Sequence, residues 1–69
     1  MVEVFSTNVQ GFDQSHTLVQ QLLAHFPKSK INFDLDDCDK ILRVEGESLL
    51  PLKIVEVLKA SGYNCNILE

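Results

Sequence analysis

The sequence predicts an α+β fold in which an antiparallel four-stranded sheet carries two helices on one face. Two stretches place apolar residues at spacings of three and four, which is typical of amphipathic helices. A third stretch alternates apolar and polar residues, as a half-buried strand does. The chain has 69 residues, of which 45% are hydrophobic, so we expect one domain over residues 1–69 with a packed core.

The first half of the chain predicts a strand, a helix and a second strand. Residues 1–9 are rich in β-branched side chains, which favour a strand. A helix is expected from Ser15 to Phe26, with Asp13 or Ser15 as its N-cap and Pro27 after its end. Its apolar stripe consists of Leu18, Val19, Leu22, Leu23 and Phe26. The alternating segment that follows predicts a strand with one wet face: Ile31, Asn32, Phe33, Asp34, Leu35 and Asp36.

The second half predicts a strand, a helix and a last strand. Residues 36–40 are polar and predict a hairpin turn, and residues 41–45 predict the returning strand. Ser48 is the expected N-cap of the second helix, with Pro51 in its first turn and Gly62 after its end. Leu49 and Leu52 are expected to point away from the core, and residues 63–68 predict the last strand. The expected core face of this helix contains Leu50, Ile54, Val57 and Leu58.

This order of elements, βαββαβ, is that of the ferredoxin-like fold. Right-handed crossovers place both helices on the same face of the sheet and give the strand order 4-1-3-2. The second and fourth strands are then the two edges of the sheet.

Charge and composition exclude several classes of function. The net charge is −4 and the pI is about 4.9, so we expect no nucleic-acid partner, because phosphate contacts need a basic surface. No apolar run reaches the roughly 18 residues of a membrane span, and the start does not resemble a signal peptide. We therefore expect a cytoplasmic protein without membrane contact. The chain contains no recognisable catalytic motif and no Gly-rich phosphate loop, so no enzyme is predicted.

The joint pattern of helices and strands resembles the heavy-metal-associated domains of small copper chaperones and metal-pumping ATPases. The resemblance spans essentially the whole chain. It is based on Val19, Leu23 and Phe26-Pro27, on Ile31-x-Phe33-x-Leu35-Asp36, and on Ile54-x-x-x-Leu58-x-x-x-Gly62-Tyr63. It implies metal transport through a Met-x-Cys-x-x-Cys loop between the first strand and the first helix, where two thiolates hold a soft ion such as Cu(I).

This chain departs from the family at that loop. The register set by the helix pattern puts Phe12 and Ser15 at the two cysteine positions. The register set by Val9 as the buried Met equivalent puts Gly11 and Gln14 there. Neither register supplies a thiol, so the metal-binding role that the resemblance implies does not carry over to these residues.

Three other side chains remain as candidate ligands: His16, Cys38 and Cys65. Cys38 is expected in the turn between the second and third strands, and Cys65 early in the last strand. The second and fourth strands are the two edges of the sheet, so two strand spacings of about 4.8 Å each separate the cysteines and argue against a disulfide. His16 with Cys65 could form a weak copper or zinc site, although two ligands seldom suffice.

Two functions therefore stay open. The first is a non-catalytic interaction or regulatory module without a cofactor, whose contact surface is Gly11 to His16 together with Tyr63. The resemblance implies this surface, because the metal-binding relatives dock partner domains there. The second is a metal-binding or metal-transport protein with altered ligands, namely His16, Cys65 or Cys38. A homodimer would improve the geometry of that second site by bridging two copies.

Overall fold

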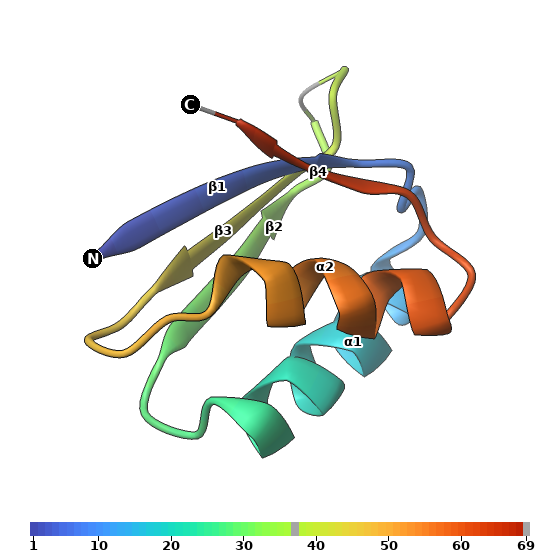
Figure 1. Ribbon diagram of the computed structural model, residues 1–69. Coiled ribbons are helices and arrows are strands. Elements are labelled where there is room, and N and C mark those ends of the chain that lie inside the picture. The colour runs from blue at the N-terminus through green and yellow to red at the C-terminus, as the bar shows by residue number, and fades with distance from the viewer. Residues whose placement is uncertain (37, 69) are drawn as a thin grey trace.

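The computed structural model describes residues 1–36 and 38–68 and confirms the predicted α+β fold. Four strands form one antiparallel sheet in the order β2-β3-β1-β4, and both helices cover the same face (Figure 1). β2 and β4 are the two edges, as the sequence predicts. The elements are β1 (Val2–Thr7), α1 (Phe12–His25), β2 (Lys30–Asp34), β3 (Ile41–Glu45), α2 (Pro51–Ala60) and β4 (Cys65–Leu68).

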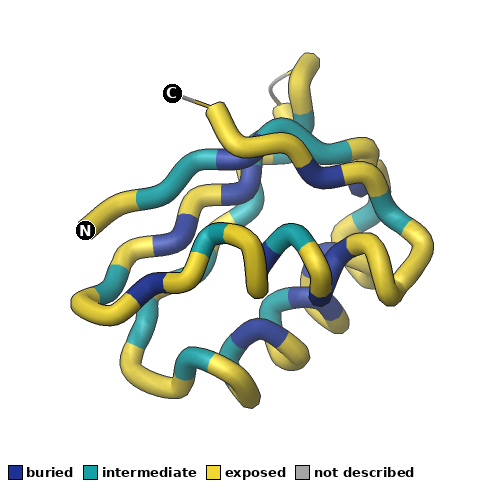
Figure 2. Tube along the Cα trace, in the orientation of Figure 1, coloured by how far each residue is buried: buried dark blue, intermediate teal, exposed yellow. Residues whose placement is uncertain are grey.

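The core fills the space between the sheet and the two helices (Figure 2). Leu42 and Val44 alternate inward from β3, and Leu18 and Leu22 point from successive turns of α1. Phe5, from the central strand β1, is fully buried among them. The members with the lowest exposure are Phe5, Val9, Leu18, Leu22, Leu42, Val44, Ile54 and Leu58.

Helix α1 begins at Phe12, three residues before the predicted start at Ser15. Gly11 is the N-cap, with extended backbone angles of φ −105° and ψ 146°. Its N–H donates to Oε1 of Gln14 at 3.2 Å, which satisfies one backbone group at the helix start. The prediction of Asp13 or Ser15 as the cap is therefore wrong, because both residues lie inside the first turn.

Helix α2 begins with Pro51, and Leu50 rather than Ser48 is its N-cap. Proline disfavours a helical conformation of the residue before it, and Leu50 is accordingly extended, with φ −117° and ψ 92°. Leu50 is 61% exposed and Leu49 only 6%, so the predicted orientations of these two leucines are wrong. Leu52 is exposed, as predicted.

The end of α2 is a Schellman motif centred on Gly62. The N–H of Tyr63 donates to the carbonyl of Leu58, and the N–H of Gly62 to that of Lys59, both at 3.0 Å. Gly62 has φ +90°, a left-handed conformation that glycine adopts without strain. The predicted C-cap is confirmed, and the motif turns the chain into β4, which begins at Cys65.

The predicted turn between β2 and β3 is present, although Asp37 lies outside the described residues. Lys40 closes it with φ +49°, and its Nζ donates to the carbonyl of Leu35 at 2.8 Å. This side chain links the two ends of the hairpin turn.

Candidate functional site

The loop between β1 and α1, where the resemblance implies a metal site, is held by two neighbouring loops. The hydroxyl of Thr7 donates to the carbonyl of Lys40 at 2.6 Å. On the other side, Oδ1 of Asn8 accepts the N–H of Asn64 at 2.8 Å. Val9 is fully buried and holds the loop to the core from below. The loop is thus fixed on three sides, which orders it before any partner binds.

The four candidate positions for the two implied cysteines, two in each register, differ widely in exposure. The ring of Phe12 is 80% exposed, whereas Ser15 is 8% exposed and is the only buried polar residue among those described. The hydroxyl of Ser15 donates to the carbonyl of Phe12 at 2.8 Å, so its hydrogen bond stays within the helix. Gly11 is half-buried at the cap, and Gln14 is exposed.

Gly11 and Gln14 lie side by side, unlike Phe12 and Ser15. A Cβ atom at position 11 would lie 3.5 Å from Oε1 and 3.8 Å from Cγ of Gln14, which is ordinary van der Waals contact. Two side chains at positions 11 and 14 would therefore meet. Phe12 and Ser15 differ in environment, because one faces solvent and the other the interior. The geometry of a two-ligand clamp thus fits the register set by Val9.

Helix α1 divides the predicted contact surface into two grooves. The first groove is lined by Asp13, Gln14, Thr17, Leu18, Gln21, Ser61 and Tyr63. The second lies on the other side of the helix, along β2, and is lined by Phe12, Ser15, His16, Val19, Ile31, Asn32, Phe33 and Leu35. Tyr63 is thus brought next to Gln14, whereas His16 lines the other groove.

The candidate ligands His16 and Cys65 are placed apart. His16 lines the groove along β2, and Cys65 lies in β4, the strand at the opposite edge of the sheet. Cys38 is exposed in the turn after β2, and both cysteines are free thiols. Within residues 1–36 and 38–68, no three His, Cys, Asp or Glu side chains are grouped so that they could hold a metal ion.

Cys65 is also a poor thiolate donor. Only 2% of this residue is exposed, and burial raises the pKa of its thiol from 9.0 to about 11, although the charge of Lys59 acts in the opposite direction. Metal ions bind the deprotonated thiolate, so the protonated thiol expected near neutral pH binds them poorly. The residues present do not fit the thiolate pair that the resemblance implies.

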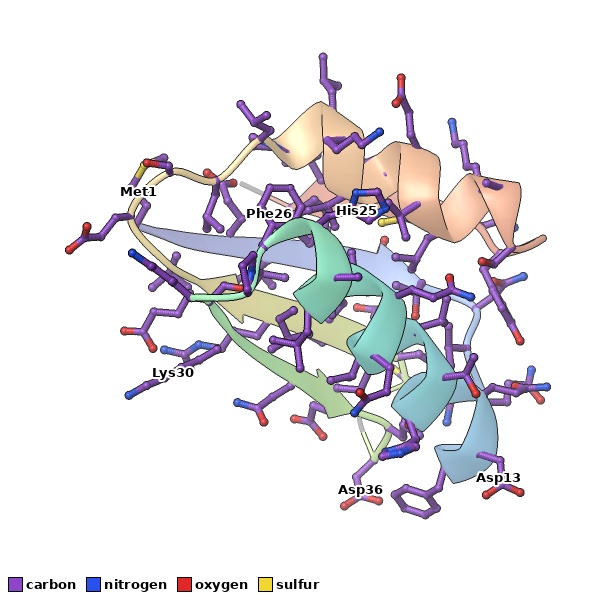
Figure 3. The ribbon with its side chains drawn as sticks, turned by 90° about the horizontal axis from the view of Figure 1, so that it is seen from below. Met1, Asp13, His25, Phe26, Lys30 and Asp36 are labelled. Atoms are coloured by element: carbon purple, nitrogen blue, oxygen red, sulfur yellow. The ribbon has the colours of Figure 1, made fainter. Side chains whose placement is uncertain are left out.

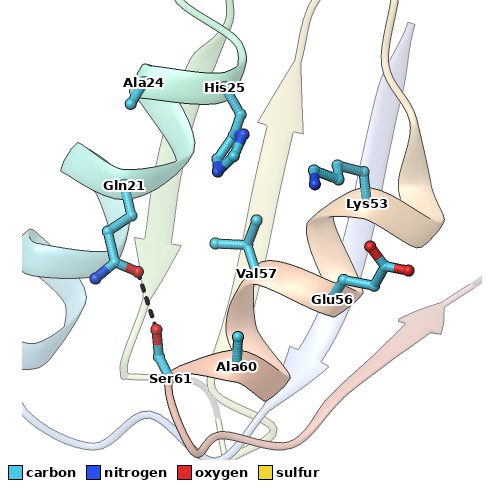
Figure 4. Close-up of a pocket in the computed structure, with 8 residues that line it drawn as sticks. All are labelled: Gln21, Ala24, His25, Lys53, Glu56, Val57, Ala60 and Ser61. Carbon is cyan, nitrogen blue, oxygen red and sulfur yellow. Dashed lines mark hydrogen bonds between the residues drawn. The ribbon is translucent and has the colours of Figure 1, made fainter.

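A further groove lies between the two helices (Figure 4) and has a volume of about 400 Å³. His25 from the last turn of α1 lies across it from Lys53 and Glu56 of α2. The hydroxyl of Ser61 donates to Oε1 of Gln21 at 2.9 Å and so joins the two helices. Ser61 is therefore engaged by an amide rather than by the imidazole that a nucleophilic serine needs.

The reasoning from sequence missed three features of this region. Gln14 completes the cap of α1, and Thr7 and Asn8 tie the loop to its neighbours. A glutamine three residues after an N-cap is a recognisable sequence signal for the first feature. The two ties join residues 33 and 56 positions apart in the chain, so no local pattern shows them.

Comparison with known proteins gave no match: no family model, curated protein or solved structure shows significant similarity to this chain. None of the helices in the described part of the chain has the length and apolar character that crossing a membrane requires. The structure shows the ferredoxin-like βαββαβ fold, and the loop at the start of α1 contains no cysteine.

Proposed function

We propose that this chain is a non-catalytic module of the heavy-metal-associated type, without thiolate metal binding, that contacts a protein partner through the start of α1. The fold and the fully buried Val9 support this proposal, because both agree with the resemblance found in the sequence. The absence of a thiol from positions 11, 12, 14 and 15 supports the loss of metal binding.

The exposed ring of Phe12 is the observation that carries the proposal. It is the most exposed large hydrophobic side chain among the described residues, at 80%. Burying a phenylalanine side chain is worth about 1.5–3 kcal/mol, so this position gains much from a partner. The ring also borders the groove along β2, whose lining combines the apolar Val19, Ile31 and Phe33 with polar residues. An aromatic side chain beside such a groove is typical of a protein contact.

The alternative, a metal-binding or metal-transport protein with altered ligands, has less support. Its best pair of ligands is His16 and Cys65. These two residues lie apart, His16 in the groove along β2 and Cys65 in β4 at the opposite edge of the sheet. Burial keeps the Cys65 thiol protonated. A copper or zinc function would therefore require ligands from a second copy.

The test compares the wild-type chain with two variants. Each is purified from its source cells, and the proteins recovered with it are measured. Phe12→Ser removes the exposed ring at the start of α1. Leu52→Ser is the matched control, because Leu52 is 73% exposed but lies on α2. We expect Phe12→Ser to reduce recovery of the bound partner by about tenfold or more, as the lost burial predicts. Leu52→Ser should leave recovery unchanged.

Circular dichroism of both variants checks that the fold is kept. Equal recovery of the same proteins by wild type and Phe12→Ser would contradict the proposal. Loss of recovery in both variants would also contradict it, because the effect would then not belong to the start of α1.

A further inference from the structure

On its outer side, the edge strand β2 pairs with no other strand in the described part of the chain. The inner side of β2 pairs with β3, from Lys30 opposite Glu45 to Asp34 opposite Ile41. Figure 3 shows Lys30 at the start of this strand, beyond the end of α1 marked by His25 and Phe26. An open edge of this kind can pair with another strand unless charge or shape prevents it.

The pairing pattern shows which residues of β2 face this open edge. The N–H of Gly46 donates to the carbonyl of Met1 at 3.0 Å. Hydrogen-bonded pairs alternate along an antiparallel ladder, so the even-numbered residues of β3 face β1 and the odd-numbered ones face β2. Each odd-numbered residue of β3 lies opposite an even-numbered residue of β2. The backbone groups of Ile31 and Phe33 therefore point to the open edge.

The charges on β2 are complementary to those of a second β2 running antiparallel. The strand reads Lys30-Ile31-Asn32-Phe33-Asp34. A two-fold axis at Asn32 sets Lys30 of each copy opposite Asp34 of the other. The same register sets the open backbone groups of Ile31 opposite those of Phe33, as a hydrogen-bonded antiparallel pair requires. From this self-complementary pattern we propose that two copies of the chain associate through β2 and form one continuous eight-stranded sheet.

Two of the other registers are disfavoured by the same charges. An axis at Lys30 would set the two lysines opposite each other, and an axis at Asp34 would do the same for the two aspartates. Like charges directly opposite each other destabilise a strand pair. The other edge, β4, reads Cys-Asn-Ile-Leu and has no charged side chain to select a register. The charge pattern therefore assigns the contact to β2.

The apolar side chains beside this edge would be buried by the second copy. Ile31, Phe33 and Leu35 are only half-buried, and they line a groove with Val19 of α1. The two-fold axis of an antiparallel strand pair is perpendicular to the sheet, so both copies keep their helices on the same face. The two α1 helices then flank the new strand pair, and Val19 and Leu23, both half-buried, lie on the facing sides. The second copy and the proposed partner would share the groove of Val19, Ile31 and Phe33, whereas the backbone groups along the β2 edge and the Lys30–Asp34 pairs belong to the dimer contact alone.

Sedimentation of the wild-type chain and three charge variants tests the pairing. The wild type should approach twice the mass of the 7.8 kDa chain as its concentration rises. Lys30→Asp and Asp34→Lys each create two pairs of like charges and should weaken the dimer by about tenfold. The double variant exchanges the two charges and should restore the dimer to within about twofold of wild type. Lys53→Asp is the matched control, since Lys53 is exposed and lies on α2 rather than on β2.

Amide hydrogen exchange gives a second readout that needs no variant. In the dimer the N–H groups of Ile31 and Phe33 donate across the interface, so they should exchange slowly and lose this protection on dilution. A wild-type chain that stays monomeric at millimolar concentration, with these two amides exchanging freely, would overturn the proposal. A double variant that remains as weak as the single variants would also overturn it.

Discussion

At the scale of single residues, Gly11 and Gln14 show how the start of α1 differs from a metal-binding loop. The two residues are in contact, and Gln14 satisfies the N–H of Gly11, so the pair serves as a helix cap. The sequence alone left two registers open at this loop. The structure favours Gly11 and Gln14 as the ligand positions, because side chains placed there would meet. The ambiguity could not be removed from sequence, since the apolar pattern of the helix favours one register and Val9 as the buried Met equivalent favours the other.

The second residue of interest is Cys65, whose buried thiol makes stability depend on pH. Its pKa is 9.0 in the unfolded chain and about 11 in the folded one. Between these values the unfolded chain releases the proton and the folded chain keeps it. The free energy of unfolding should therefore fall as the pH rises from 9.0 towards 11, and urea titrations across this range measure the effect.

Variants of the two cysteines isolate this contribution. Cys65→Val keeps an apolar side chain of similar size and should remove this part of the slope. Cys38→Ser changes an exposed thiol and should leave the slope as in wild type. If Cys65→Val retains the full dependence on pH, the thiol is not its source.

At the scale of elements, the sequence predicted the type and order of every strand and helix, but not the helix starts. Both errors have a local cause. Gln14 caps α1 from inside the helix, and Pro51 forces Leu50 into an extended conformation. The second error also led to Leu50 being predicted as buried in place of Leu49. A helical wheel that treats Leu50 as a helical residue assigns Leu49 to the wrong side. Helix periodicity places residues only after the first helical residue is known.

The end of α2 depends on the backbone freedom of Gly62. No atom lies within 4 Å of a Cβ built at this position, so a new side chain would meet no obstacle there. Its left-handed φ of +90° would nevertheless strain an alanine by about 1–2 kcal/mol. We expect Gly62→Ala to lower the free energy of unfolding by that amount in urea titrations.

Gly62→Asn is the matched comparison, because asparagine tolerates the left-handed region better than alanine. It should lose clearly less stability than Gly62→Ala. Equal losses would show that something other than the backbone conformation at Gly62 limits stability.

At the scale of the whole molecule, the fold agrees with the resemblance, whereas the residues at the implied metal site do not. The βαββαβ sheet with two helices has the architecture that the resemblance implies. Function belongs to the site rather than to the fold, and the site has a glycine, a phenylalanine, a glutamine and a serine at its four candidate ligand positions. The structure therefore confirms the fold that the resemblance implies, and the contact through the start of α1 stays a proposal.

The most direct test of this account is a Cu(I) titration followed by the amide NMR shifts of the reduced protein. It is run on Cys38→Ser, which removes the exposed thiol, and on the same chain with Gly11→Cys and Gln14→Cys. We expect no saturable shift with the natural loop, and saturable shifts at the start of α1 once the two cysteines are present. Saturable shifts of the natural loop at residues 12–16 and at Cys65, with submicromolar affinity, would contradict it.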